Sequence, residues 1–209
     1  MHAPARSCIG KRQRIVDFDG QADYCPSFLC KDLADKAFSR AVSTIQWRQE
    51  RTVLYGRSLD VPRRSAWFSC HGHSYTYSNI VHEPRPLPGF LEAIRQQLEE
   101  QSGFRFNSVL ANLYENGQHS VGWHADNEPE LGSDVNIASF SLGANRKLRL
   151  RHRSRRDLRL SVTLEHNSLL LMCAPMQDYW LHELPKTSRD VGPRINFSFR
   201  NIVGPTNQD

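Results

Sequence analysis

Two histidines and one aspartate have the residue types and the order of a metal-binding set. His124 and Asp126 occupy alternate positions in the stretch VGWHADNEPE (121–130), and a second histidine, His182, follows in the stretch DYWLHELP. One carboxylate and two histidines can hold a metal ion on one side and leave its other positions open, which is typical of non-haem Fe(II) oxygenases. Histidines with a purely structural role are commoner, so these two stretches alone leave both interpretations open.

The stretch RINFSFR (194–200) separates polar from apolar side chains with a period of two. In a β-strand this period places polar residues on one face and apolar residues on the other: Arg194, Asn196, Ser198 and Arg200 against Ile195, Phe197 and Phe199. The polar face could meet water, as it commonly does in antiparallel sheets, or it could line the interior of a jelly roll. In the interior two arginines would need an anionic ligand, because buried charge is costly unless it is paired. A dicarboxylate would suit them beside iron.

Basic residues are concentrated in one part of the chain. The formal net charge is +5, and eight of the fourteen residues from Arg146 to Arg159 are Arg or Lys. Such a cluster attracts polyanions, and phosphate neutralisation usually dominates the affinity of nucleic-acid binders. Arg149 and Arg151 are the candidate contacts in this segment. A solvated hairpin that aids solubility is the alternative.

The elements that must position these residues are two helices and a set of short strands. Helices are expected within 30–50, with an apolar face at Leu33, Ala37, Val42 and Ile45, and within 89–103, ending at Gly103. Beyond Phe106, alternating segments predict strands at 108–114, 135–143, 147–153, 158–166, 168–175 and 194–203. Two helices followed by many short strands indicate an α+β protein with a β-sandwich or jelly-roll core.

Length and composition are those of one intracellular domain. The 209 residues suit a single domain, 1–209, with residues 1–25 open to being a loosely ordered N-terminal extension. No apolar run approaches the ~20 residues that span a bilayer, and the N-terminus has no apolar region typical of a secretion signal. Five cysteines without a CxxC pair fit reduced thiols. A cytoplasmic or, in a eukaryote, nuclear location is expected.

Four stretches together resemble one known family. NLYENG, HADNE, WLHELP and RINFSFRNI are similar to the motifs of the AlkB family of Fe(II)- and 2-oxoglutarate-dependent dioxygenases, nearest in pattern to its DNA-repair subgroup. The resemblance covers roughly residues 50–203. It implies a double-stranded β-helix, or jelly-roll, core with N-terminal helices and a nucleotide-recognition lid.

The resemblance also implies which residues hold the two cofactors. Fe(II) would be bound by His124, Asp126 and His182. Arg194 would form the salt bridge to the far carboxylate of 2-oxoglutarate, and the rest of that pocket would come from Asn112, Tyr114, Asn196, Ser198 and Arg200. The implied activity, with O2 as cosubstrate, is oxidative demethylation of N1-methyladenine and N3-methylcytosine in DNA, or also RNA, with release of formaldehyde and succinate.

Contacts to the base are implied in three further places. Tyr75 and Tyr77 correspond to the nucleotide-recognition region, Glu128 to a carboxylate that contacts the exocyclic amine, and Leu54 with Tyr55 to a finger that fills the gap left by a flipped base. The alternative for each aromatic residue is packing within the fold.

Three functions are therefore weighed, with a monomer and no membrane partner expected in each. The first is a demethylase that repairs N-alkylated bases in nucleic acid. The second is a 2-oxoglutarate-dependent oxygenase that acts on protein or a small molecule. The third is a non-catalytic nucleic-acid-binding module that keeps a relic metal site.

Overall fold

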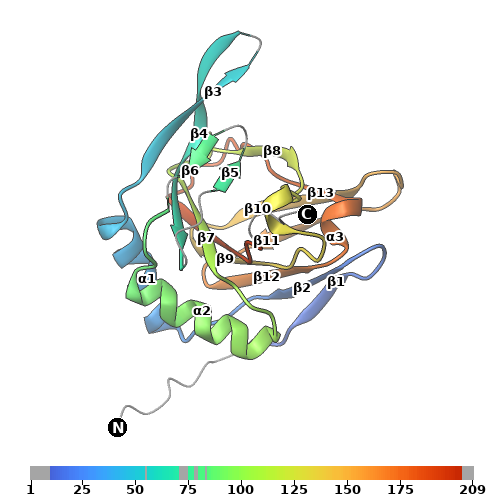
Figure 1. The fold of residues 1–209 in the computed structure, drawn as a ribbon, viewed down its shortest axis with the longest axis horizontal. Helices are drawn as coiled ribbons and strands as arrows, with labels where there is room; N and C mark the ends of the chain where they lie inside the picture. The colour runs from blue at the N-terminus through green and yellow to red at the C-terminus, as the bar shows by residue number, and fades with distance from the viewer. Residues whose placement is uncertain (1–9, 55, 71–74, 78–79, 83, 204–209) are drawn as a thin grey trace, which may run out of the picture.

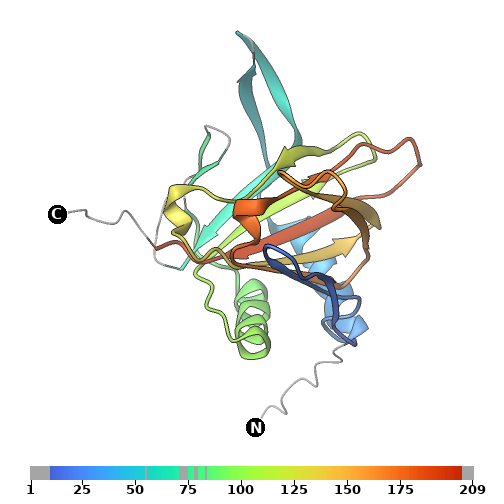
Figure 2. The ribbon, with the colours of Figure 1, turned by 90° about the vertical axis from the view of Figure 1, so that its right-hand side faces the viewer.

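The structure is a computed structural model of the chain. It describes residues 10–54, 56–70, 75–77, 80–82 and 84–203, and of residues 54, 75–77 and 80–82 it describes the backbone alone. Within these ranges the strands pair antiparallel and form two main sheets, with two long helices beside the larger one (Figures 1 and 2). The expected antiparallel, sheet-rich α+β fold is confirmed, and two facing sheets are consistent with a jelly roll.

The larger sheet has eight strands within the described residues. Their order across the sheet is β1 (Gln13–Val16), β2 (Gln21–Cys25), β12 (Ser168–Cys173), β9 (Ile137–Gly143), β14 (Arg194–Arg200), β7 (Ser108–Tyr114), β4 (Arg57–Ser69) and β3 (Arg48–Leu54). β14 lies near the middle and pairs with β7 on one side and with β9 on the other. The strand that carries the two candidate arginines is therefore held by pairing along both edges.

The smaller sheet has four strands and faces the larger one. Its order is β11 (Arg159–Leu164), β10 (Arg146–His152), β13 (Trp180–Leu184) and β8 (Val121–His124). Side chains from both sheets, such as Leu110, Leu150 and Met172, pack into one cluster between them. A separate pair, β5 (Tyr75–Tyr77) and β6 (Ile80–His82), is labelled below the β3–β4 hairpin in Figure 1. Short helical turns occur at η1 (Pro129–Leu131) and α3 (Met176–Tyr179).

The two long helices cover the outer face of the larger sheet. α1 (Lys31–Thr44) and α2 (Gly89–Ser102) bury apolar residues against that face, and Ile195, Phe197 and Phe199 of β14 belong to the same cluster. The phenylalanine rings of residues 90 and 197 meet edge to face at 6.4 Å, a favoured aromatic geometry. The apolar face of β14 is thus buried under the helices, which leaves its polar face to the space between the sheets.

The helix expected at 89–103 is confirmed. α2 begins after Pro88 and ends at Gly103, whose φ of 77° lies in the left-handed region, which glycine adopts at low cost. Leu91, Ile94 and Leu98 are buried, at a helical spacing.

The helix expected within 30–50 is shorter, and its buried face differs from the prediction. α1 ends at Thr44 and residues 48–50 belong to β3. The buried residues are Ala34, Ala37 and Ala41, whereas Leu33 and Val42 are exposed. Because a helix turns by ~100° per residue, the five-residue step from position 37 to 42 places Val42 well away from the face that Ala37 buries. Of the expected face, Ala37 and Ile45 are buried, and Phe38 also packs against the same cluster.

The strands expected beyond Phe106 are all present, but several strands lie earlier in the chain. β1 and β2 precede α1, and β3 to β6 separate the two helices, so the expected order of helices first and strands second is wrong. The segment from Gln13 to Cys25 belongs to the larger sheet rather than to a loose extension. Residues 1–9 lie outside the described residues. Charged stretches such as RQERTVL lack the clean alternation that marks a strand.

Two further expectations concern thiols and membranes. Among the described residues, all cysteines are free, namely Cys25, Cys30, Cys70 and Cys173, in agreement with the expected reduced state. In the same part of the chain, no helix is both long and apolar enough to cross a bilayer.

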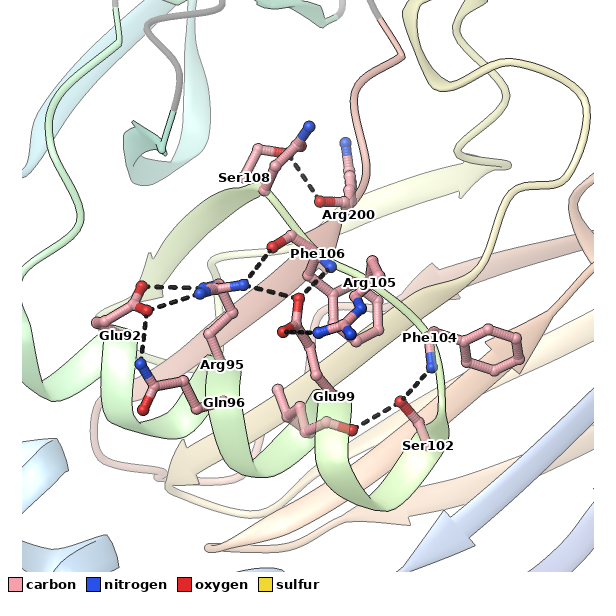
Figure 3. A network of polar contacts seen from close by, with 12 residues as sticks. Glu92, Arg95, Gln96, Glu99, Ser102, Phe104, Arg105, Phe106, Ser108 and Arg200 are labelled. Atoms are coloured by element: carbon pink, nitrogen blue, oxygen red, sulfur yellow. Dashed lines mark hydrogen bonds and ion pairs between the residues drawn. The ribbon is translucent and has the colours of Figure 1, made fainter.

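A polar network fixes α2 to the start of β7. Figure 3 shows Arg95 between Glu92 and Glu99, with its guanidinium also directed at the carbonyl of Phe106. Glu99 accepts hydrogen bonds from the Arg95 Nη1 atom at 2.7 Å and from the backbone N–H of Phe106 at 2.8 Å. The hydrogen bonds that Arg95 donates to Glu92 are the main cause that raises the pKa of Arg95. The network holds the loop at 104–106, from which β7 enters the sheet.

Replacement of Glu99 tests this anchor. The Glu99 side chain is 10% exposed, so Glu99→Ala removes, in a sheltered place, the partner of two guanidiniums, those of Arg95 and Arg105, and of one backbone N–H. Hydrogen bonds to charged groups contribute roughly 1.5–3 kcal/mol, and the free energy of unfolding should fall by about 2 kcal/mol in urea denaturation. Glu100→Ala, at the adjacent exposed position, is the control and should change it by less than about 0.5 kcal/mol. Equal effects of the two substitutions would contradict the anchoring role.

Candidate metal centre

The three residues expected to bind a metal meet at one point between the two sheets. His124 ends β8, Asp126 lies in the loop that follows, and His182 lies in β13, directly opposite His124 in the strand pairing. One ligand atom from each residue lies within 4.8 Å of the others. The His124 Nε2 atom is 3.7 Å from Asp126 Oδ1, and the His182 Nε2 atom is 4.0 Å from Asp126 Oδ2. Two imidazoles and a carboxylate on one side of a point form the facial set that leaves further metal positions open.

Protonation in this cluster suits metal binding. Burial alone would raise the pKa of Asp126, but the charge of Arg200, with smaller contributions from the two histidines, holds that pKa below its usual value. Arg200 Nη2 lies 3.0 Å from Asp126 Oδ2. Burial, followed by the neighbouring His124, lowers the pKa of His182 to about 3. An ionised carboxylate and a neutral imidazole are the forms that bind metal ions.

Hydrogen bonds orient two of the ligands. The His124 Nδ1 atom is 2.8 Å from the carbonyl oxygen of Gly122. Because a carbonyl only accepts, Nδ1 carries the proton and the lone pair of the neutral ring lies on Nε2. The backbone N–H of Asp126 donates to Gln177 Oε1 at 3.0 Å, in the interior. Asp126 Oδ1 is buried and has no hydrogen-bond partner within the described residues, so an oxygen is left available to a metal ion.

A polar floor on the larger sheet faces these ligands. It is built by β14 and the adjacent β7, whose residues pair in register as Arg194 with Tyr114 and Asn196 with Asn112. All residues expected in the cofactor pocket line one cavity together with the three ligands: Asn112, Tyr114, Arg194, Asn196, Ser198 and Arg200. The prediction that the polar face of β14 lines the interior is thereby confirmed, and its alternative, a solvated face, is wrong.

Hydrogen bonds fix the side chain of Arg194 within this floor. Its Nη2 atom donates to Ser141 Oγ at 2.9 Å and to Asn196 Oδ1 at 3.0 Å, and its guanidinium lies 5.2 Å from the centre of the Tyr114 ring. Arg194 is 2% exposed, and burial lowers its pKa to about 10. Within the described residues it has no carboxylate partner, and its Nε has no acceptor. A buried guanidinium without a counter-charge is a strong indication of an anionic ligand.

Arg63 is a further wall residue, and the sequence motifs did not point to it. It is buried, lines the cavity, and donates from Nε to Asn112 Oδ1 at 3.0 Å. The signal that could have identified it is the alternation along β4, where Val61, Arg63 and Ser65 are buried and the residues between them are exposed. Gln177 was not expected at all, because it lies in the single turn of α3 and acts through a backbone contact.

Of the residues expected to contact substrate, those whose side chains the structure describes do not line this cavity. Glu128 is half-buried two residues beyond Asp126, but it is not among the described residues that line the cavity. Arg149 and Arg151 point to the outer face of the smaller sheet, since Leu148 and Leu150 of the same strand are buried on the inner side. The side chains of Leu54, Tyr75 and Tyr77, and the whole of Tyr55, lie outside the described residues.

The sequence matches a family model described as the 2OG-Fe(II) oxygenase superfamily over residues 21–200. It is 36% identical over 187 residues to a Bos taurus protein named alpha-ketoglutarate-dependent dioxygenase alkB homolog 3, covering 85% of this chain and 65% of that protein. It is 35% identical to the Mus musculus DNA oxidative demethylase ALKBH2, covering 81% of this chain and 75% of that protein.

The chain is shorter than some of these relatives and shares its fold with a solved structure. The chain spans about two thirds of the length of the alkB homolog 3 proteins, 64% in the human protein, with which it is 34% identical. The solved structure of OsALKBH1 superposes with a TM-score of 0.63 at 15% identity, over 90% of this chain and 100% of that one. At that identity the likeness shows a common fold.

The contact between Gln177 and Asp126 can be tested through metal affinity. Gln177→Met keeps the length of the side chain but removes the acceptor for the Asp126 N–H, so the ligand loop loses its fixed position. Loss of such a supporting contact typically weakens metal binding by roughly 10–100-fold, measured here by calorimetric titration of metal-free protein with Mn(II).

Asn145→Leu is the matched control, because Asn145 Oδ1 accepts from the backbone N–H of His166 at 3.2 Å, and neither of these residues lines the metal cavity. This substitution should lower the free energy of unfolding and leave the dissociation constant for Mn(II) unchanged. An unaltered dissociation constant in Gln177→Met would show that Asp126 keeps its position without Gln177.

Proposed function

Because the chain belongs to the AlkB family of Fe(II)- and 2-oxoglutarate-dependent oxygenases, we propose that it is an oxidative demethylase of N-alkylated bases in nucleic acid. The observation that carries the proposal is the shared cavity, in which a buried His-Asp-His set faces a buried arginine without a counter-charge. A metal and a dicarboxylate would together satisfy both features. Relatives named as a DNA oxidative demethylase and as alkB homolog 3 support the reaction class.

The residues present fit both cofactors of the family. His124, Asp126 and His182 would hold Fe(II), which agrees with the free Oδ1 atom of Asp126 and the neutral His182 ring. Arg194 would bind the far carboxylate of 2-oxoglutarate, beside a wall made of Asn112, Tyr114, Asn196, Ser198 and Arg200. Bound together with O2 as the oxidant, the two cofactors would supply an oxidation in which 2-oxoglutarate is converted to succinate and CO2 and the methyl group is hydroxylated and released as formaldehyde.

The part of the chain itself in this reaction is to bind, to orient and to exclude water. Arg200 neutralises the Asp126 carboxylate at 3.0 Å without displacing it. Arg194 is restrained by Ser141 and Asn196, so its guanidinium need not reorganise to meet a carboxylate. Six apolar residues of the cavity wall limit the access of water, namely Leu110, Val121, Leu148, Leu164, Met172 and Leu184.

A methylated base is proposed as the group that enters above the metal. A base stacked in a duplex cannot reach a buried centre, so such an enzyme flips the base out or takes a single strand. β3 and β4 form a hairpin that rises from the body in Figure 2. Val53 is 72% exposed on it and Leu59 is 47% exposed. Exposed apolar side chains on such a hairpin are suited to enter a gap in a base stack, and we propose Leu54 and Tyr55 as the finger.

Contacts to the nucleic acid are proposed for four residues. Tyr75 and Tyr77, in the strand pair β5 and β6, would belong to a nucleotide-recognition lid and would stack on the base. Glu128 would accept a hydrogen bond from the exocyclic amine, which requires the loop after Asp126 to turn its side chain toward the cavity. Arg151 would contact phosphate. We further propose that residues 1–209 act as one domain and as a monomer.

The function is tested with the protein loaded anaerobically with Fe(II) and then exposed to air, 2-oxoglutarate and oligonucleotides. These carry N1-methyladenine or N3-methylcytosine in DNA and RNA, single- and double-stranded. We expect loss of one methyl group with stoichiometric succinate, read by mass spectrometry. Asp126→Ala should abolish turnover, because the set loses its only carboxylate, and should retain affinity for the oligonucleotides.

The other outcomes separate the remaining functions. Succinate without loss of a methyl group would point to a protein or small-molecule substrate. Oligonucleotide binding without any turnover by protein shown to contain iron would indicate a binding module. Demethylation that persists in Asp126→Ala would contradict the assignment of the metal ligands.

Glu128→Ala tests the proposed contact with the base. Loss of one hydrogen bond to the amine should reduce the preference between methylated bases, expressed as the ratio of their kcat/KM values, by roughly tenfold, corresponding to ~1–1.5 kcal/mol. Glu130→Ala, in the following turn, is the control and should keep the ratio of the wild type. The same ratio in Glu128→Ala and wild type would remove Glu128 from the site.

A further inference from the structure

The outer face of the smaller sheet carries a basic groove that the cavity around the metal does not use. Along β10 and β13 the residues alternate, so that Leu148 and His182 face the metal cavity and Arg149 and Glu183 face outward. The outward side chains surround a hollow of about 480 Å³, lined by Trp123, Arg149, Arg151, Arg159, Ser161 and Glu183. We call it the outer-face groove.

The strand register in this groove sets two like charges against each other. Arg151 of β10 stands directly opposite Arg159 of β11, and like charges in that position destabilise a sheet. Neither arginine has a carboxylate partner among the described residues, whereas Arg149 pairs with Glu183 at 3.3 Å. A bound anion between Arg151 and Arg159 would relieve the repulsion between them. Among the described residues that line the groove, Glu183 is the only carboxylate that would repel such an anion.

An aromatic ring lies beside these charges. The Arg151 guanidinium is 4.3 Å from the centre of the Trp123 ring, which is within the range of a cation–π contact. Trp123 is half-buried, and a flat ring next to guanidinium groups is the combination that holds single-stranded nucleic acid, with bases on the ring and phosphates on the arginines. Trp123 also directly precedes His124, so the groove begins at the strand that carries a metal ligand.

We propose that the outer-face groove binds a single strand of nucleic acid flanking the nucleotide that enters the metal cavity. Arg151 and Arg159 would contact successive phosphates, and Trp123 would stack on a neighbouring base. This inference rests on the proposed function and deepens it, since it predicts a preference for longer single strands. An acidic peptide could meet the charges, but it would not use the ring of Trp123.

The first test is binding of unmethylated, single-stranded DNA of about 15 nucleotides, measured by fluorescence anisotropy at several salt concentrations. The double variant Arg151→Gln with Arg159→Gln should bind about tenfold more weakly and reduce the slope of log K against log salt by about one to two. The matched control is Lys36→Gln with Arg40→Gln, which removes the same charge from exposed positions on α1 and should change the affinity little.

A second pair of variants tests the ring. Trp123→Leu should weaken binding of the same DNA by about fivefold or more, and Trp123→Phe should restore most of the affinity, because a stacking face is retained. Thermal unfolding of both variants verifies that they are folded. Equal affinities of Trp123→Leu and wild type, or a loss that Phe does not restore, would overturn the stacking role.

Turnover separates this inference from the proposed function. Wild type should demethylate the ~15-nucleotide substrate with a higher kcat/KM than a methylated trinucleotide, and the arginine double variant should lose that preference. Demethylation with the wild-type preference in the double variant would refute the groove while the proposed function stands. Without any demethylation by wild type, the proposed function fails, and the binding measurements alone decide the groove. Polyglutamate is tested as a competitor of the DNA. If it displaces the DNA from wild type and from Trp123→Leu equally well, the groove would be assigned to an acidic peptide.

Discussion

The ion pair between Asp126 and Arg200 is the interaction on which the centre of this protein depends. A carboxylate buried between two sheets would by itself be protonated or displaced toward water, yet this one stays ionised because a guanidinium lies 3.0 Å away. The pair also joins two layers, since Arg200 ends β14 of the larger sheet and Asp126 follows β8 of the smaller one. The same ion pair therefore balances the buried charge of Asp126 and joins the two sheets to each other.

This ion pair requires β14 to direct its polar side chains into the interior between the sheets. Its apolar side chains pack outward under α1 and α2, and its polar side chains point between the sheets. The helical layer is what makes this possible, because it gives Phe197 and Phe199 an apolar environment on the side of the sheet that would otherwise meet water. A shift of the register by one residue would exchange the two faces. It would bury three apolar side chains in the cavity and place both arginines under the helices.

Sequence patterns succeeded where the chemistry is local and failed where it depends on the partners of a strand. His124 with Asp126, and the alternation of residues 194–200, are short-range features that survive in any fold that contains them, and both lie where they were expected. α1 shows the opposite case, since it buries Ala34, Ala37 and Ala41 while the larger Leu33 and Val42 remain exposed. The positions of Arg151 and Arg159 relative to each other depend on a strand register that the sequence does not encode in any recognisable motif. Gln177 likewise reaches Asp126 across 51 residues of chain.

The position of β8 at the edge of the smaller sheet has a kinetic consequence. Within the described residues, β8 pairs only with β13, whereas β13 pairs with strands on both sides. Segments at a sheet edge, followed by a loop, open at a lower free energy than the interior of the same sheet. Amide hydrogens of β8 should therefore exchange with solvent sooner than those of β14. A bound ion would leave through this local opening, with His182 and the floor of the cavity still folded, so its residence time would be set independently of the lifetime of the native state.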